Sequence, residues 1–129
     1  MKKKPNIIAI AGFDPSGGAG VLADIKTISA LGGCGRGVVT CATAQSSKGV
    51  KEMTCFGDNI VANQLDSILS DLKVSAIKIG VVSNPDSIIA IAKTLKAFPK
   101  IPIVLDTVLS ASANGYRFLG KTGITALRR

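Results

Sequence analysis

The sequence predicts an α/β fold in which a mostly parallel sheet lies between layers of helices. Short apolar runs alternate with segments whose apolar residues recur at helical spacing. The apolar runs are continuous, which is typical of strands buried on both faces. Glycine, proline or asparagine separates most of these segments. A chain of 129 residues with 47% apolar residues is expected to form a single domain.

The first part of the chain predicts a strand, a glycine-rich turn and a helix. Residues 6–11 (NIIAIA) are a continuous apolar run, and apolar residues recur at helical spacing from Val21 to Leu31. Gly32 and Gly33 then provide a helix stop. The intervening turn reads AGFDPSGGAG, and the whole unit is the expected start of a βαβ arrangement.

The remaining elements continue the alternation. They are predicted as a strand at 37–43, a short edge strand at 50–55, a helix at 58–72, a strand at 75–80, a helix at 85–97 and a strand at 101–105. Asp58 and Asn84 are the expected N-caps of the two helices, with Pro85 at the first helical position of the second. Ile60 is expected on the apolar side of the first of these helices.

Polar residues interrupt the apolar pattern where the predicted strands end. Asp14 and Ser16 follow the first strand, Gln45 the second, the Gly80 loop a later one, and Asp106 the last. In parallel sheets, ligands bind beyond the carboxyl ends of the strands. These residues are therefore expected to border one ligand site.

The glycine-rich turn does not match the standard phosphate-binding motifs. A P-loop requires Lys and Ser or Thr after its last glycine, whereas Gly20 is followed by Val21, and the dinucleotide fingerprint is out of register. The amides of Gly18, Ala19 and Gly20 could still meet a polar ligand at a helix N-terminus. The alternative is a turn that needs glycine only for positive φ angles. Similarly, Asp24 could accept a ligand's amino group or could be an exposed helix carboxylate.

Composition narrows the possible partners. A net charge of +8 favours anionic ligands in general, but aromatic residues are only 4%, which argues against a base-stacking nucleic-acid surface. Apolar runs fall well short of the ~18 residues of a membrane span, so a cytoplasmic protein is expected. Cys34, Cys41 and Cys55 lack CxxC spacing and the sequence has no histidine, so buried or half-buried free thiols are expected, rather than a zinc site.

Four segments closely resemble one enzyme family. They are IAIAGFDPSGGAGVLADIKTISALG, TAQSSKGV, NIVANQLDSILSDLKVSAIKIGVV and IPIVLDTVL. Over residues 7–119 the chain resembles the bacterial hydroxymethylpyrimidine/phosphomethylpyrimidine kinases of thiamine biosynthesis, in the ribokinase-like superfamily. The resemblance implies a three-layer α/β/α fold with a mostly parallel sheet. It also implies phosphoryl transfer, dependent on ATP and Mg²⁺, to a hydroxymethylpyrimidine and then to its monophosphate.

The resemblance also assigns site residues by their positions in the matching motifs. Gly12 and Asp24 fall where family members line the pyrimidine site, and Gln45 falls where a side chain hydrogen-bonds the ring. Val81 and Val108 match positions that form walls around the ring, and Asp106 matches an aspartate near the phosphates and the metal. No direct metal ligand is implied in this chain.

The sequence departs from the family pattern in three ways. Val81 stands where methionine is usual, and residues 111–115 lack a lysine that the family often has. The chain is also about half the family length, so the second half, with its glycine loop, catalytic residues and ATP site, is missing. We therefore expect residues 1–129 to be a single, incomplete kinase domain, its N-terminal, substrate-binding half, which is inactive alone. The ending inside GITALRR suggests a truncation.

An incomplete sheet would leave an open edge and an uncovered apolar face. We accordingly expect a homo-oligomer or pairing with a separate second half. Two alternatives to the kinase hypothesis remain open at this point. One is a pyrimidine-binding or interaction module without catalysis, and the other is a relative that acts on pyridoxal.

Overall fold

A computed structural model describes residues 4–128, which form five strands and four helices. The strands are β1 (Asn6–Phe13), β2 (Cys34–Ser46), β3 (Gly49–Cys55), β4 (Val74–Ile79) and β5 (Ile103–Leu105). The helices are α1 (Gly20–Ala30), α2 (Asp58–Asp71), α3 (Pro85–Leu95) and α4 (Lys121–Leu127). The strand order is β3-β2-β1-β4-β5, with β3 antiparallel to β2 and the other neighbours parallel.

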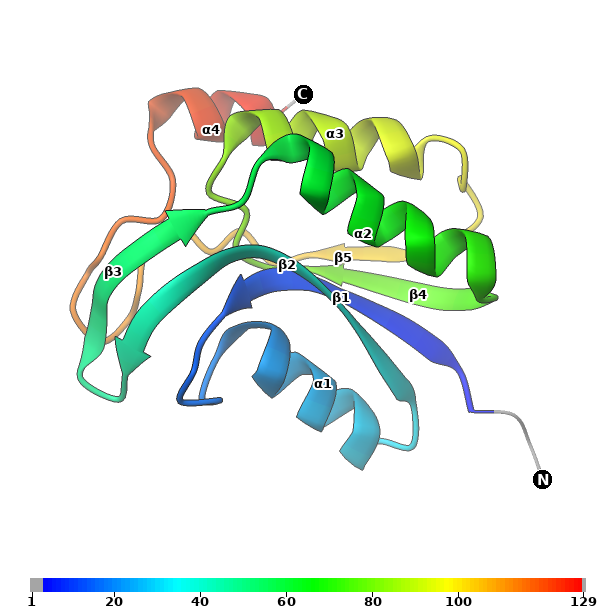
Figure 1. Ribbon diagram of the computed structural model, residues 1–129, viewed down its shortest axis with the longest axis horizontal. Helices are drawn as coiled ribbons and strands as arrows, with labels where there is room; N and C mark the ends of the chain where they lie inside the picture. The colour runs from blue at the N-terminus through cyan, green and yellow to red at the C-terminus, as the bar shows by residue number, and fades with distance from the viewer. Residues whose placement is uncertain (1–3, 129) are drawn as a thin grey trace.

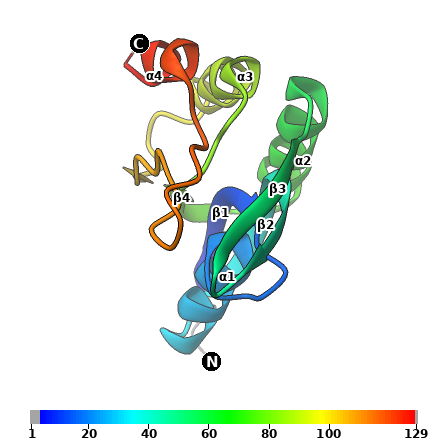
Figure 2. The same cartoon turned by 90° about the vertical axis from the view of Figure 1, so that its left-hand side faces the viewer.

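The elements form three layers. Helix α1 covers one face of the sheet, and helices α2, α3 and α4 lie on the other (Figures 1 and 2). Each parallel connection from strand to strand passes through a helix, as the alternating sequence pattern requires. The predicted α/β/α class with a mostly parallel sheet is therefore confirmed.

The central strand β1 has two different faces. Ile8 and Ile10 are fully buried in the larger core, which α2 and α3 complete. Ala9 and Ala11 are buried on the opposite face, against Val21 of α1. The alanines are small, and because side chains alternate along a strand they all face α1, which can therefore pack close to the sheet.

Several predicted boundaries need correction. Strand β2 is longer than predicted at both ends, because residues 34–36 pair with β1 and residues 44–46 pair with β3, whereas β5 is shorter. The N-cap of α2 is Gly57, so Asp58 is the first helical residue rather than the cap. Ile60 is 51% exposed, although the helical pattern placed it on the apolar side. The Asn84 cap is confirmed, since its side chain accepts a hydrogen bond from the Asp86 amide at 3.0 Å.

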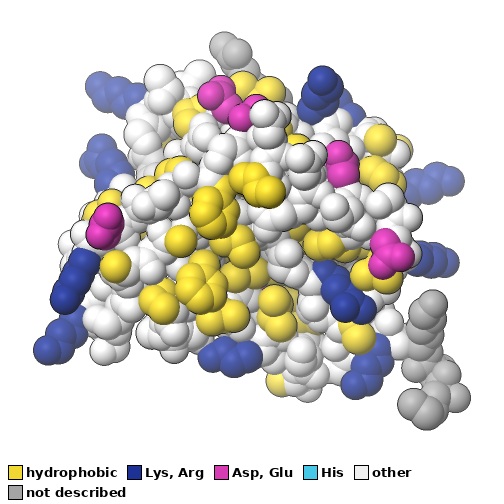
Figure 3. Space-filling model, viewed as in Figure 1, with side chains coloured by type: hydrophobic (Ala, Val, Ile, Leu, Met, Phe, Trp, Pro, Cys, Tyr) yellow, Lys and Arg dark blue, Asp and Glu magenta, His cyan; other side chains and the backbone are white. Residues whose placement is uncertain are grey.

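The surface carries dispersed positive charge. In the space-filling view, hydrophobic side chains gather near the middle of the visible face, and lysines and arginines lie mainly around its outline (Figure 3). Within residues 4–128, every helix is too short or too polar to cross a membrane.

Candidate functional site

The turn between β1 and α1 is organised around the buried carboxylate of Asp14, which is 3% exposed. The amide and hydroxyl of Ser16 donate to its Oδ1 at 2.9 and 2.8 Å, and the Ala19 amide donates to its Oδ2 at 2.9 Å. A carboxylate is favourable here because it lies at the positive N-terminal end of α1. The alternative in which the Ala19 amide meets a ligand is therefore not realised, since the protein's own carboxylate occupies it.

Two glycines of this turn are required by its backbone. Gly17 and Gly20 have φ angles of +69° and +61°, a region that L side chains rarely adopt. A Cβ atom at position 20 would also collide with the carbonyl oxygen of Gly12. Of the two interpretations of the glycine-rich turn, the structure supports the one based on positive φ angles.

A cavity of about 510 Å³ lies beside this turn, at the carboxyl ends of β1, β4 and β5 and along the C-terminal half of β2. Its lining includes all six positions that the sequence singled out, namely Gly12, Asp24, Gln45, Val81, Asp106 and Val108. The polar residues that follow the strand ends therefore lie together at one edge of the sheet, as expected. The roles of the six residues in binding stay predictions.

Gln45 lies in β2, opposite Val50 of β3 and next to a break in the strand register. Thr43 has its hydroxyl near two oxygens, at 2.9 Å from the Phe13 carbonyl and at 3.2 Å from Gln45 Oε1. Within residues 4–128, the Gln45 amide nitrogen donates no hydrogen bond. Its two N–H groups are therefore available to a ligand in the cavity.

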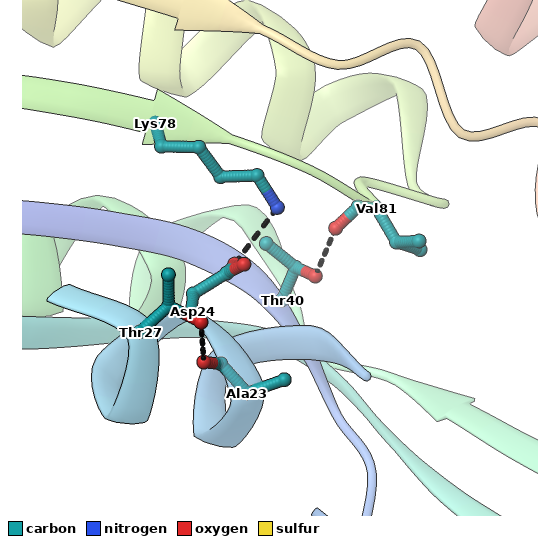
Figure 4. Close-up of polar contacts among 6 residues, drawn as sticks. All are labelled: Ala23, Asp24, Thr27, Thr40, Lys78 and Val81. Atoms are coloured by element: carbon teal, nitrogen blue, oxygen red, sulfur yellow. Dashed lines mark hydrogen bonds and ion pairs between the residues drawn. The ribbon is translucent and has the colours of Figure 1, made fainter. Parts of the chain in front are cut away.

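Asp24 forms an ion pair with Lys78, a residue that the sequence analysis missed. Lys78 Nζ lies 2.8 Å from Asp24 Oδ2, and the two side chains are 30% and 21% exposed (Figure 4). Asp24 is thus not the exposed helix carboxylate that was the alternative interpretation. The available signal was a lysine inside the apolar strand SAIKIG, because a cation in a buried strand needs a polar partner.

The loop after β4 is attached to β2 by a buried side chain. The Thr40 hydroxyl, 1% exposed, donates to the Val81 carbonyl oxygen at 2.6 Å (Figure 4). Gly12 lies close to the same loop, and a Cβ atom there would be 2.8 Å from Cys41 Sγ and 4.0 Å from Val81 Cβ. The absence of a side chain at Gly12 therefore leaves room for the packing of Cys41 and Val81.

The three cysteines differ in exposure. Cys41 is buried, Cys34 is intermediate and Cys55 is exposed, so the expected buried or half-buried state is wrong for Cys55. Burial raises the pKa of the Cys41 thiol, and the nearby Cys55 raises it further, while the hydrogen bond with Thr40 acts in the opposite direction. The Cys41 thiol is therefore held in its neutral form beside the cavity at neutral pH.

The sheet order and the helix layers define a ribokinase-like α/β/α fold, which solved structures of phosphomethylpyrimidine and pyridoxal kinases share. The structure of phosphomethylpyrimidine kinase from Clostridium difficile 630 matches 97% of this chain with a TM-score of 0.86 and 38% identity. The structure of an ADP complex of Bacillus subtilis pyridoxal kinase matches 98% of it with a TM-score of 0.81 and 27% identity. The matched regions are 53% and 46% of those two chains.

The chain belongs to the phosphomethylpyrimidine kinase family, whose sequence pattern matches residues 14–129. The hydroxymethylpyrimidine/phosphomethylpyrimidine kinase of Escherichia coli K12 is 41% identical over 126 residues, which are 98% of this chain and 47% of that enzyme. The chain thus spans about half the length of the curated relatives that it matches.

Proposed function

We propose that this chain is the substrate-binding side of a kinase that phosphorylates 4-amino-5-hydroxymethyl-2-methylpyrimidine and then its monophosphate in thiamine biosynthesis. The observation that carries this proposal is the cavity, which gathers Asp24, Gln45 and Asp106 at the carboxyl ends of the strands. In a chain of this family, that edge is the expected position of the phosphoryl acceptor.

The cavity offers chemistry that suits an aminopyrimidine. Asp24 can accept a hydrogen bond from an amino group, and Gln45 offers a donor and an acceptor side by side to the ring edge. Val81 and Val108 provide apolar walls for the ring faces. Binding the ring between these groups would orient its hydroxymethyl group, and orientation is a principal contribution of the protein to phosphoryl transfer.

The proposed cofactors are ATP and Mg²⁺, and the residues present fit them only in part. Asp106 supplies a carboxylate at the cavity, close to which the phosphates and Mg²⁺ would lie. The glycine-rich turn is not proposed as a phosphate cradle, because Asp14 already occupies its Ala19 amide. Mg²⁺ would neutralise charge that develops on the transferring phosphoryl group. We propose that the ATP site and the catalytic residues belong to a second half, and that residues 1–129 are inactive without it.

Two alternatives remain as outcomes of the test. The likeness to a pyridoxal kinase structure favours pyridoxal as the second candidate substrate. A pyrimidine-binding module without catalysis would share the same cavity. We also propose a cytoplasmic location and no nucleic-acid partner, in keeping with the composition.

Isothermal titration calorimetry with the hydroxymethylpyrimidine and with pyridoxal tests the proposal. We expect the pyrimidine to bind, and Gln45→Leu to weaken its binding about tenfold or more, since a buried ligand group loses its hydrogen-bond partner. Asn63→Leu, at an exposed position of α2, is the matched control and should leave binding unchanged. Tighter binding of pyridoxal would favour the alternative substrate, and no heat with either ligand would overturn the proposal. Binding without ATP turnover when a family second half is added would favour the module.

A further inference from the structure

We propose that Lys78 is a positioning residue for substrate recognition, whose ammonium group fixes the Asp24 carboxylate so that its second oxygen faces the amino group of the ligand. The inference rests on the proposed function, because it takes an aminopyrimidine as the ligand. Lys78 does not need to touch the ligand in order to act in this way.

The sheet register places the two side chains together. Lys78 is the register partner of Ala9 in β1 and of Val104 in β5, so its side chain emerges on the face that α1 covers. On that face, Ala9 and Ala11 are small and leave space above the sheet for a long side chain. Asp24 meets the ammonium from α1, one turn beyond the glycine-rich turn, as Figure 4 shows.

Gly80 provides the space that the ammonium group occupies. A Cβ at position 80 would lie 2.8 Å from Lys78 Nζ and 3.4 Å from the Ala11 Cβ. Gly80 does not have a positive φ angle, so its backbone conformation does not require glycine. The missing side chain therefore serves the position of Lys78, and a methyl group there would displace the flexible end of the lysine.

The ion pair uses only one of the two carboxylate oxygens. Asp24 Oδ2 accepts from Lys78, and Oδ1 accepts no hydrogen bond from any residue between 4 and 128. The other carboxylates that line the cavity are Asp14 and Asp106, and Asp14 is occupied by its own turn. Asp24 thus lines the cavity with one oxygen held by Lys78 and the other without a donor among residues 4–128. Without Lys78, a partly exposed carboxylate could rotate toward water, and the acceptor would lose its fixed direction.

The test compares two ligands that differ only in the amino group. These are the hydroxymethylpyrimidine and its analogue 5-hydroxymethyl-2-methylpyrimidine, measured by calorimetry against the same proteins. The wild-type chain should prefer the amino compound by about tenfold or more, as expected for a hydrogen bond to a charged group. Lys78→Met should abolish most of this preference. Lys73→Met, at an exposed position just before β4, is the matched control and should keep it.

Gly80→Ala is a second variant, which retains both charges and places a methyl group 2.8 Å from the present position of the Lys78 ammonium, at the edge of the cavity. It should reduce the preference for the amino compound in the same direction as Lys78→Met, with the fold retained by circular dichroism. If Lys78→Met keeps the preference, or weakens both ligands equally, Lys78 is structural and the inference is overturned. Equal binding of both ligands to the wild type would also overturn it, while pyrimidine binding would stand. If neither ligand binds the wild type, the proposed function itself fails.

Discussion

The turn between β1 and α1 and the edge strand β5 differ in how completely their chemical groups are paired. In the turn, the buried Asp14 carboxylate receives hydrogen bonds from Ser16 and Ala19. At β5, the three consecutive residues Ile103, Val104 and Leu105 are 46%, 65% and 45% exposed. An apolar groove of about 360 Å³ adjoins this strand, lined mainly by β4, α3, α4 and β5.

The difference indicates which part of the molecule is preorganised. The turn needs no further partner to hold the β1 side of the cavity in place, because its polar groups bond to one another. Strand β5 has its second edge unpaired within residues 4–128, and an exposed apolar edge favours association. The chain therefore combines a preformed cavity wall with an uncovered sheet edge.

The largest expected effect comes from Gly20→Ala in the turn. The substitution combines a positive φ angle with a collision against the Gly12 carbonyl oxygen, so the free energy of unfolding should fall by about 3 kcal/mol or more. Gly32→Ala separates the two causes, because Gly32 has a φ angle of +86° and open space around its Cβ position. The free energy of unfolding in urea should fall by about 1–2 kcal/mol in this control. Equal losses in the two variants would contradict the collision.

Asp14→Ala should have the next largest effect. It leaves the amides of Ser16 and Ala19 without their acceptor, and an unpaired amide costs about 1–3 kcal/mol according to its burial. We expect a loss of about 2–3 kcal/mol in the free energy of unfolding. Asp66→Ala, at an exposed position of α2, should change it by less than about 0.5 kcal/mol. A loss for Asp14→Ala no larger than that of the control would show that the turn is not preorganised.

A substitution in the edge strand β5 should change the self-association of the chain rather than its folding. We expect the chain to self-associate, and Val104→Lys to weaken that association about tenfold, because a charge on an edge strand opposes pairing. Analytical ultracentrifugation over a concentration series measures the effect. Ile89→Lys, at a 58% exposed apolar residue of α3, tests whether the loss of association is specific to the edge strand. A monomeric wild-type chain at tens of micromolar would contradict this prediction.

The smallest effect concerns Cys41 beside the cavity. Because burial raises the pKa of its thiol in the folded state, the folded chain keeps a proton that the unfolded chain loses above its ordinary value of 9.0. The resulting stability is fully present below pH 9.0 and is lost as pH rises through the folded-state pKa. One titrating group can change the free energy of unfolding by at most about 1.4 kcal/mol per pH unit.

Unfolding in urea between pH 8 and 10 measures this slope. Cys41→Ala should reduce the decline in stability, and Cys34→Ala, at another position of β2, should retain it. An identical pH dependence in the wild type and in Cys41→Ala would show that Cys41 makes no such contribution.

Much of the fold was predictable because its signals are local. Continuous apolar runs, helical spacing and caps such as Asn84 depend on residues close in the chain, so the order of strands and helices followed from them. Boundaries were less accurate where a partner extends or shortens an element. Strand β2 continues beyond the predicted 37–43 because β3 pairs with it, and the exposure of Ile60 depends on what α2 packs against.

The sequence by itself indicated the polar strand-end residues Asp14, Ser16, Gln45 and Asp106 that border the cavity, because parallel strands bring the residues after their carboxyl ends to one edge. Only the tertiary structure decided that Lys78 pairs with Asp24. Lys78 and Asp24 are 54 positions apart, and they meet because the sheet register and the packing of α1 bring them together. By contrast, the pairing of Asp14 with Ser16 and Ala19 is local, because these residues follow it by two and five positions in the chain. Local sequence specifies the element in which a side chain lies and the partners close to it in the chain, whereas a partner that is distant in the sequence is fixed only when the chain packs.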